Sequence, residues 1–204
     1  TVTVNPLPAI DAGANDAICI GESYLLNATG GSTYTWDNGL GTGASHSVSP
    51  TTTTTYEVTG TDANGCINTA QIEITVNSLP TVDAGTNQTT CAGSQVTISA
   101  TGASTYNWDN GLGAGASQNV SPTTTTVYEV EGTDANGCVN TAQVTINVNA
   151  LPNVSAGVDA SICDGSSTTL TASGADSYVW DNGLGAGVSH TVSPANTTIY
   201  EVAG

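Results

Sequence analysis

The sequence predicts an all-β protein built from a tandem of small antiparallel β-sandwiches. Three observations predict this fold: one sequence unit recurs every 72 residues, apolar side chains alternate with polar ones along short segments, and turn-forming residues separate these segments. No segment shows the spacing of apolar residues that an amphipathic helix requires. We therefore expect roughly seven short strands in each repeat, arranged as a sandwich.

The repeat is clearest in the positions of cysteine, tryptophan and tyrosine, which recur at intervals of 72 residues. The predicted domains are residues 8–79, residues 80–151 and a truncated third repeat over residues 152–204. Residues 1–7 match the last strand and linker of a preceding repeat, so we expect the chain to be a window from a longer array. The recurring residues are Cys19, Cys91 and Cys163; Cys66 and Cys138; Trp36, Trp108 and Trp180; and Tyr56, Tyr128 and Tyr200.

Alternation with a period of two marks the strands within each repeat. Tyr34 and Trp36 share one face of a short segment, and Ile72 and Ile74 alternate with polar residues in a longer one. Turns are predicted at residues 37–39, Asp-Asn-Gly, and at residues 62–65, Asp-Ala-Asn-Gly. Strands joined by such short turns are typical of antiparallel sheets.

Short proline-containing linkers join the repeats at residues 5–8, 77–80 and 149–152. Proline restricts the backbone and makes a linker less flexible. Each repeat should then contact mainly its neighbours, which predicts a semi-rigid rod.

The charge composition excludes several functions. The chain has 17 acidic residues, no lysine and no arginine, which gives a formal net charge of −17. Nucleic-acid binding depends on basic side chains that replace phosphate counterions, so we expect no nucleic-acid partner. No apolar run approaches the ~20 residues of a membrane helix, so we expect no direct membrane insertion.

An ordered series of motifs in each repeat carries a resemblance. The series is Pro-x-Val-Asp-Ala-Gly, Cys-x-Gly, Leu-x-Ala-x-Gly, Tyr-x-Trp-Asp-Asn-Gly, Val-Ser-Pro-x-x-Thr-Thr-x-Tyr-Glu-Val and Gly-Thr-Asp-Ala-Asn-Gly-Cys. It resembles the Ig-like and PKD-like repeats of large Bacteroidetes surface proteins, which include cell-surface adhesins and gliding-motility-associated proteins. The resemblance implies repeats that serve mostly as stalks, and export to the cell surface or medium by a type IX route.

Five cysteines in an exported β-protein predict disulfides, and two pairings remain open. Within one repeat, Cys19 would pair with Cys66, and Cys91 with Cys138. In an Ig-type topology, however, the two cysteines of one repeat lie at opposite ends of the sandwich, roughly 15 Å apart at about 3.3 Å per strand residue. A disulfide does not span that distance. The alternative is a bond between repeats, Cys19 to Cys138, while the odd cysteine, Cys163, reflects the truncated third repeat.

Acidic turn residues are candidate calcium ligands, because Ca²⁺ is bound by carboxylate and carbonyl oxygens. The same residues also favour tight turns without any metal, since Asp and Asn side chains bond to the nearby backbone. Ser155 replaces the aspartate next to the third linker, so that position does not encode a cation at every linker. The candidates are Asp11, Asp37, Asp62, Asp83, Asp109 and Asp134.

The remaining aromatic and histidine residues predict structure rather than chemistry. Each tryptophan shares its strand face with a tyrosine, which favours core packing over a sugar-binding surface. Tyr56 and its copies resemble the corner tyrosine of sandwich folds, so their hydroxyl groups are expected to bond to the backbone. His46 and His190 are replaced by Gln118 in the second repeat, which disfavours a histidine function common to all repeats.

These observations predict a non-enzymatic structural array that forms the shaft of an extracellular adhesin or surface filament. Proline linkers and disulfides would stiffen it, and neighbouring repeats or other copies of the chain would be its partners. The alternative is an array that binds calcium or surface glycans, with repetition supplying avidity.

Overall fold

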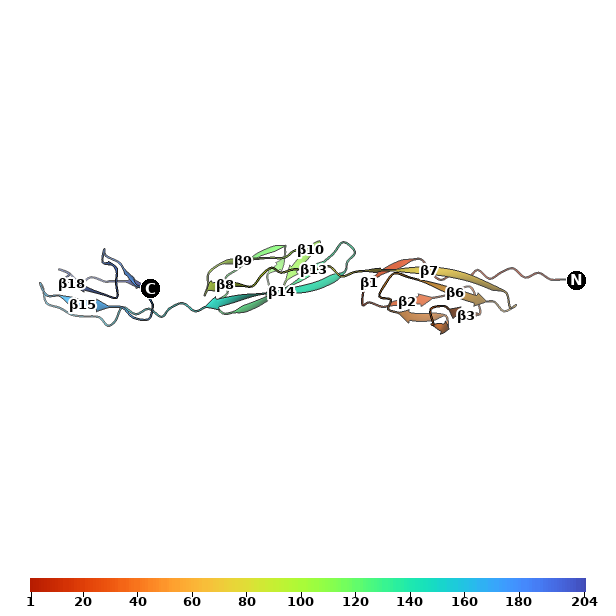
Figure 1. Cartoon of the computed structure of the whole chain (residues 1–204), viewed down its shortest axis with the longest axis horizontal. Helices are drawn as coiled ribbons and strands as arrows, with labels where there is room; N and C mark the ends of the chain where they lie inside the picture. Colours follow the sequence, from red (N-terminus) through yellow and green to blue (C-terminus); the bar gives the residue numbers. More distant parts are fainter. The chain divides into compact units, whose positions relative to one another are not determined.

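The computed structural model describes all 204 residues and contains only β-strands, joined by turns and loops (Figure 1). Because it contains no helix, no helical segment has the length and apolar character needed to cross a membrane. The predicted all-β class and the sandwich architecture are confirmed.

The first two repeats have the same seven strands, displaced by 72 residues. In the first repeat they are β1 (Asp16–Cys19), β2 (Tyr24–Asn27), β3 (Thr33–Trp36), β4 (Gly41–Thr42), β5 (Ser45–Val48), β6 (Thr54–Thr61) and β7 (Ile67–Asn77). In the second they are β8 (Gln88–Cys91), β9 (Val96–Ser99), β10 (Thr105–Trp108), β11 (Gly113–Ala114), β12 (Ser117–Val120), β13 (Thr126–Thr133) and β14 (Val139–Asn149).

The third repeat has fewer and shorter strands. They are β15 (Thr168–Thr171), β16 (Val179–Trp180), β17 (Gly185–Ala186), β18 (Ser189–Val192) and β19 (Val202–Ala203). The copies of the long last strands β7 and β14 would lie beyond residue 204. The residues that correspond to β1 and β8 form no strand in this repeat.

Each complete repeat pairs a five-stranded sheet with a two-stranded sheet. The large sheet of the first repeat has the order β1-β7-β6-β3-β4, and β2 pairs with β5 in the small sheet. Strands β6 and β7 run side by side in antiparallel register, with Tyr56 opposite Ile72 (Figure 1). The expectation of a wholly antiparallel sandwich needs one correction, because β1 pairs with β7 in parallel, Asp16 opposite Ile74. This pairing makes β7 an interior strand with neighbours on both edges.

The core of the first repeat lies between the two sheets. Leu26 and Val48 of the small sheet pack in one cluster with apolar residues of the large sheet. Period-two alternation places these side chains on the inner faces, while their neighbours along each strand face solvent. The buried apolar side chains of the large sheet are those of Ile18, Trp36, Tyr56, Val58, Ile72 and Ile74.

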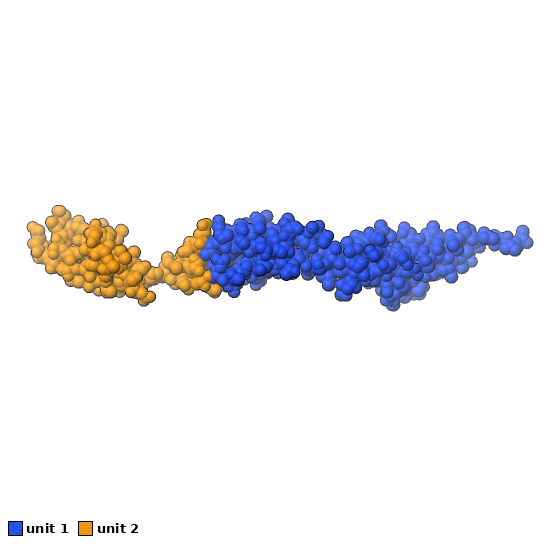
Figure 2. Space-filling model, turned by 45° about the horizontal axis from the view of Figure 1, so that its top comes forward, with its two compact units in different colours: residues 1–88, 96–120, 126–146 blue, residues 89–95, 121–125, 147–204 orange.

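The chain divides into two compact units, shown in blue and orange in Figure 2. The first comprises residues 1–88, 96–120 and 126–146, and the second comprises residues 89–95, 121–125 and 147–204. The first unit holds the first repeat and most of the second. The other holds the third repeat and the segment around Cys91.

Candidate functional site

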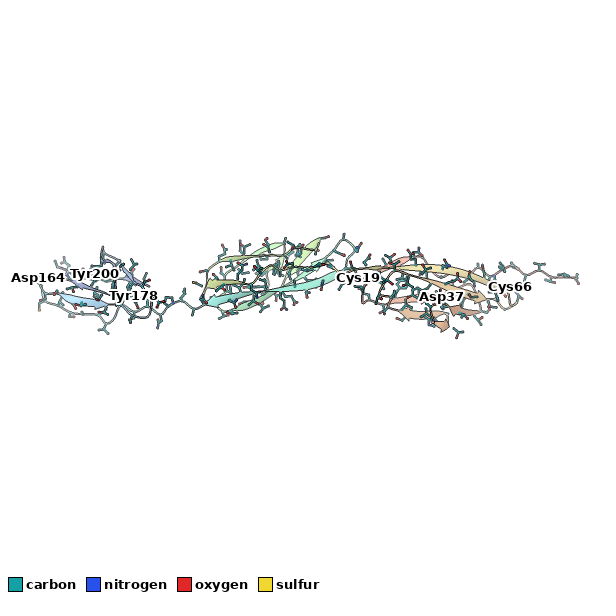
Figure 3. The ribbon with its side chains drawn as sticks, in the orientation of Figure 1. Cys19, Asp37, Cys66, Asp164, Tyr178 and Tyr200 are labelled. Carbon is teal, nitrogen blue, oxygen red and sulfur yellow. A yellow bond between two sulfur atoms is a disulfide. The ribbon has the colours of Figure 1, made fainter.

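A disulfide bond within the first compact unit joins the first and second repeats. It connects Cys19 to Cys138, which are 119 residues apart in the sequence, with their Cα atoms 5.6 Å apart. Cys19 and Cys66, by contrast, lie at opposite ends of the first sandwich (Figure 3). The structure therefore contains the pairing between repeats, one of the two that the sequence left open. The local pairing does not form because Cys19 and Cys66 lie too far apart for a disulfide bond.

A tight turn at the end of β1 presents Cys19. The backbone N–H of Cys19 donates to Oε2 of Glu22 at 2.8 Å, and the N–H of Glu22 donates back to the carbonyl of Cys19 at 3.0 Å. Gly21, between them, has a φ of +94°, a conformation that favours glycine. This reciprocal pair of hydrogen bonds fixes the position of the Cys19 backbone.

A second turn, the Asp-Ala-Asn-Gly-Cys segment, presents Cys138. One carboxylate oxygen of Asp134 accepts hydrogen bonds from the backbone N–H groups of Asn136 and Cys138, at 2.8 and 2.9 Å. The N–H of Asp134 also donates to the carbonyl of Cys138 at 3.0 Å. Cys138 is fully buried. The aspartate thus organises the turn that holds the second sulfur atom.

Hydrogen bonds next to each cysteine hold the two ends of the linker at residues 77–80. Ile20, which follows Cys19, donates its N–H to the carbonyl of Asn77 at 2.9 Å. Asn140, two residues after Cys138, donates its side-chain amide to the carbonyl of Pro80 at 3.0 Å. The disulfide is therefore a second covalent connection between the two repeats, alongside the linker.

Sequence reasoning did not identify these asparagine and glutamate contacts. The role of Asn140 could have been predicted from the repeat, because Asn68 occupies the same position after Cys66. Asn68 makes the equivalent contact, donating to the carbonyl of Pro8 at 2.9 Å. An asparagine two residues after each second cysteine, repeated at the 72-residue interval, was the available indication. Glu22 is replaced by Ser94 in the second repeat, so repetition gives no indication of its role.

Three of the cysteine candidates are free thiols in the structure. Cys66 is partly buried, and Cys91 and Cys163 are exposed. Each occupies a position whose partner, in the Cys19–Cys138 pattern, would be 119 residues away and outside residues 1–204.

The candidate calcium ligands lie in separate turns. No group of three or more His, Cys, Asp and Glu side chains gathers where it could hold a metal ion. One carboxylate oxygen of Asp37 accepts from the N–H of Glu57 at 3.0 Å, and one of Asp11 accepts from the N–H of Gly13 at 2.9 Å. The same contacts or their equivalents recur at Asp62, Asp83, Asp109 and Asp134. These contacts are the turn-forming role that the sequence also predicted, and calcium binding stays a prediction.

The Asp-Asn-Gly turn has the predicted backbone geometry. Asn38 and Gly39 both have positive φ, at 52° and 77°. The side-chain amide of Asn38 donates to the carbonyl of Thr55 at 3.1 Å, which ties the turn to the strand beside it. Trp36, just before the turn, is 3% exposed, and its copies Trp108 and Trp180 are 2% and 3% exposed, so the predicted core packing is confirmed.

The prediction for the corner tyrosine was wrong about the residue. The backbone-bonded hydroxyl belongs to Tyr34, which accepts from the N–H of Gly31 at 2.7 Å and donates to its carbonyl at 2.8 Å. Tyr106 and Tyr178 repeat this contact. Tyr56 instead packs its ring in the core, because its strand position faces inward opposite Ile72.

Burial, and secondarily the negative charge of Asp37, raises the pKa of Tyr56 above its usual value of 10.0. Both effects act in the same direction, because the deprotonated form is an anion that would be poorly solvated and repelled. Tyr56 is therefore a neutral core residue at physiological pH.

The two histidines have buried ring nitrogens without partners. The Nε2 atoms of His46 and His190 make no hydrogen bond, whereas Gln118, at the same position, donates to the carbonyl of Ala114 at 3.1 Å. The ring of His190 packs edge-on against Trp180, with centroids 6.3 Å apart. Nothing in this arrangement brings a histidine together with a nucleophile or a metal ligand.

Comparison with known proteins gives distant structural likenesses. No protein-family model matches the chain, and no curated protein matches it. Solved structures of Ig-like tandems resemble it at low similarity. Titin domains Z1 and Z2 in complex with telethonin are 13% identical over 72% of this chain and 99% of theirs, with a TM-score of 0.31. A titin I-band fragment is 11% identical over 90% of this chain and 82% of its own, with a TM-score of 0.40. The insect immune protein hemolin is 15% identical over 71% of this chain and 47% of its own, with a TM-score of 0.38.

Proposed function

We propose that this chain is part of the shaft of an extracellular adhesin or surface filament, with no catalytic activity of its own. One observation carries the proposal: the Cys19–Cys138 bond connects successive repeats next to a proline linker whose two ends are already held by hydrogen bonds. A bond between repeats contributes to their relative position, whereas a bond within one repeat would stabilise only that sandwich. Stiffness between units is the property a shaft needs, and the resemblance to Bacteroidetes surface repeats supports the same role.

The disulfide also supports an exported location, since such bonds persist in oxidising compartments and are rare in the cytosol. The partners proposed for the shaft are neighbouring repeats and other copies of the chain in a filament. With a formal charge of −17 and no basic side chains, copies repel one another at low salt. Lateral packing into a filament would therefore strengthen as salt is added.

The test measures the distribution of distances between dyes placed on the first and second repeats of the whole chain. Replacing Cys19 and Cys138 together by serine should broaden this distribution, because only the linker and its hydrogen bonds would then position the repeats. The matched control is Cys163→Ser, which removes an exposed thiol and should leave the distribution unchanged. An equally narrow distribution with and without the disulfide would contradict a stiffening role.

The alternative function is an array that binds calcium or glycans at the turns. The favouring observation is that Asp37, Asp109 and Asp181 recur at the same turn in a chain that has no basic side chain to neutralise them. Calorimetric titration with Ca²⁺ after chelation, together with a glycan array, tests this alternative. Heat release and a raised melting temperature, both lost when Asp37, Asp109 and Asp181 are together changed to asparagine, would favour it over a purely structural role.

A further inference from the structure

The carboxylates of the strands are unevenly divided between the two sheets of each complete repeat. Those of the large sheets are Asp16, Glu57, Glu73, Glu129 and Glu131. The strands of the small sheets, β2, β5, β9 and β12, contain no acidic residue. In a chain with a formal net charge of −17, the small sheet is therefore an uncharged side of each sandwich.

The outer face of the small sheet is lined by short neutral side chains. In the first repeat, the hydroxyl of Ser45 donates to Oδ1 of Asn27 at 2.8 Å. In the second repeat, the hydroxyl of Thr97 donates to Oδ1 of Asn119 at 2.7 Å. These side chains bond to one another across the strands, so a neighbouring molecule would meet no charge on this face.

One edge of the small sheet has free backbone groups. Strand β5 pairs only with β2, and the N–H of Ala28 donates to the carbonyl of Ala44 at 2.8 Å. Alternate residues of an antiparallel strand direct their N–H and C=O groups to the same edge. His46 therefore faces β2 as Ala44 does, whereas Ser45 and Ser47 direct their backbone groups to the open edge, where both residues are exposed.

The second repeat has the same open edge. The N–H of Ala100 donates to the carbonyl of Ala116 at 2.8 Å, and β12 pairs only with β9. By the same alternation, Ser117 and Asn119 direct their backbone groups away from β9, and both are exposed. The open edge is thus a feature of the complete repeat.

The other sheet edges of the first repeat are protected. Next to β2, Asp11 and Thr29 exchange two backbone hydrogen bonds, at 3.1 and 2.9 Å. In the large sheet, the edge strand β1 carries Asp16 and the edge strand β4 has only two residues. Charges and very short strands are ways in which natural proteins prevent pairing at an edge. Strands β5 and β12 contain neither a charge nor a proline.

We propose that the open edges of β5 and β12 are docking sites for a second copy of this chain, which joins its own small sheet to form one continuous sheet. The proposal rests on the proposed function, in which other copies of the chain are partners. An edge that meets itself about a twofold axis pairs in antiparallel fashion. Ser45 then lies opposite Ser47 of the second copy, which pairs every backbone group that these two residues direct to the edge.

Electrostatics favours this face for a contact between copies. A second copy also has a net charge of −17 and no basic side chain, so a contact between large sheets would bring carboxylates together. Contact through the small sheets keeps them about one sheet spacing further back, roughly 10 Å. This distance is comparable to the Debye length of about 8 Å at about 0.15 M salt. At about 0.01 M the Debye length is about 30 Å, so repulsion should oppose docking.

The direction of pairing identifies which copies can meet. Antiparallel docking joins chains that run in opposite directions. Shafts that project from two facing surfaces run in opposite directions, whereas shafts that project from one surface run in the same direction. The partner is therefore a copy presented by a facing surface. Each edge is short, and its repetition along the shaft would add avidity.

The first experiment measures self-association of the full chain by analytical ultracentrifugation at concentrations up to about 1 mM. The three free cysteines are changed to serine in every sample, so that no new disulfide can join two copies. We expect reversible association at about 0.15 M salt that weakens at about 0.01 M. Ser47→Glu combined with Asn119→Glu should raise the dissociation constant at least about tenfold, because like charges then meet across both edges.

The matched control adds the same two charges to the large sheets, as Thr59→Glu combined with Thr145→Glu. Glutamate already occupies these positions in another repeat, as Glu131 and Glu73, so the fold should tolerate both changes. The control variant should associate much more tightly than the edge variant, although the two have equal net charge. Equal weakening by both variants would overturn the docking site.

The second experiment measures amide hydrogen exchange by NMR in dilute and concentrated samples. We expect the N–H groups of Ser45 and Ser47 to exchange more slowly in the concentrated sample only, because docking pairs them. Association without this protection would overturn pairing at the edge. A chain that stays monomeric under all these conditions would also overturn it, but would leave the stiffening role of the disulfide intact, since dye distances within one chain test that role.

Discussion

At the scale of single residues, two glycines of the second repeat that both have positive φ, Gly102 and Gly111, differ in how much their substitution should destabilise the fold. Gly102 has a φ of +91°, and a β-carbon there would overlap the backbone carbonyl of Thr81. Gly111 has a φ of +77°, but a β-carbon there would meet nothing within 4 Å. Gly111→Ala should therefore lower the free energy of unfolding by about 1–2 kcal/mol, which is the cost of the left-handed conformation alone. Gly102→Ala should lower the free energy of unfolding by more, because the backbone must also move to make room for the β-carbon. Equal denaturant midpoints for the two variants would contradict this explanation.

A second residue-scale prediction concerns alkaline pH. The folded state raises the pKa of Tyr56 above 10.0, so the unfolded chain releases this proton first as the pH rises. The free energy of unfolding should therefore be unaffected by Tyr56 below pH 10 and should fall as the pH passes above it. Tyr56→Phe keeps the ring in the core and should make this fall shallower, as followed by urea unfolding between pH 8 and 11. An unchanged pH dependence in the variant would assign the fall to other groups.

At the scale of elements, β7 is an interior strand of the large sheet, and it contributes the buried side chains of Ile72 and Ile74 to the core. Ile74→Ala removes a fully buried side chain and should cost about 2–5 kcal/mol. Ile67→Ala, on the same strand but 57% exposed, should change stability by less than about 0.5 kcal/mol. Chemical denaturation of both variants measures the difference. Similar losses would mean that the two ends of the strand are equally packed.

The same strand shows what sequence reasoning reaches. The alternation of Ile72 and Ile74 predicted a strand with one buried face, because side chains on a strand point to opposite faces in turn. It did not predict the parallel pairing with β1, since a period of two carries no information about the direction of a neighbour. Cysteine spacing likewise left two disulfide pairings, because the choice depends on which ends of the sandwiches meet. Glu22 contacts Cys19, only three residues away, but Ser94 replaces it in the second repeat, so repetition did not indicate its role. The repeated asparagine marked the position of Asn140, but not its partner Pro80, which is 60 residues away in the sequence.

At the scale of the whole molecule, the disulfide limits how far the chain extends under force. With Cys19 joined to Cys138, a pull on the two termini passes through the sulfur atoms and leaves the segment between them unstretched, although the two cysteines are 119 positions apart in the sequence. At about 3.5 Å per residue, reduction should lengthen the fully unfolded chain by ~400 Å. Single-molecule stretching with and without a thiol reductant measures this difference. A chain of the same length under both conditions would show that the bond is absent.

The Asp-Asn-Gly turns have a consequence for the chemical ageing of the protein. An asparagine followed by glycine is prone to deamidation, because the glycine nitrogen reaches the side-chain carbonyl without obstruction and expels ammonia. In the folded turn, the nitrogen that deamidation would remove is the Asn38 side-chain Nδ2. This atom donates hydrogen bonds to the carbonyl of Thr55 and to the carboxylate of Asp37. The copies Asn110 and Asn182 make the same link to the neighbouring strand. Folding therefore protects these amides, and the fraction converted to aspartate in recovered protein would record the time each repeat has spent unfolded.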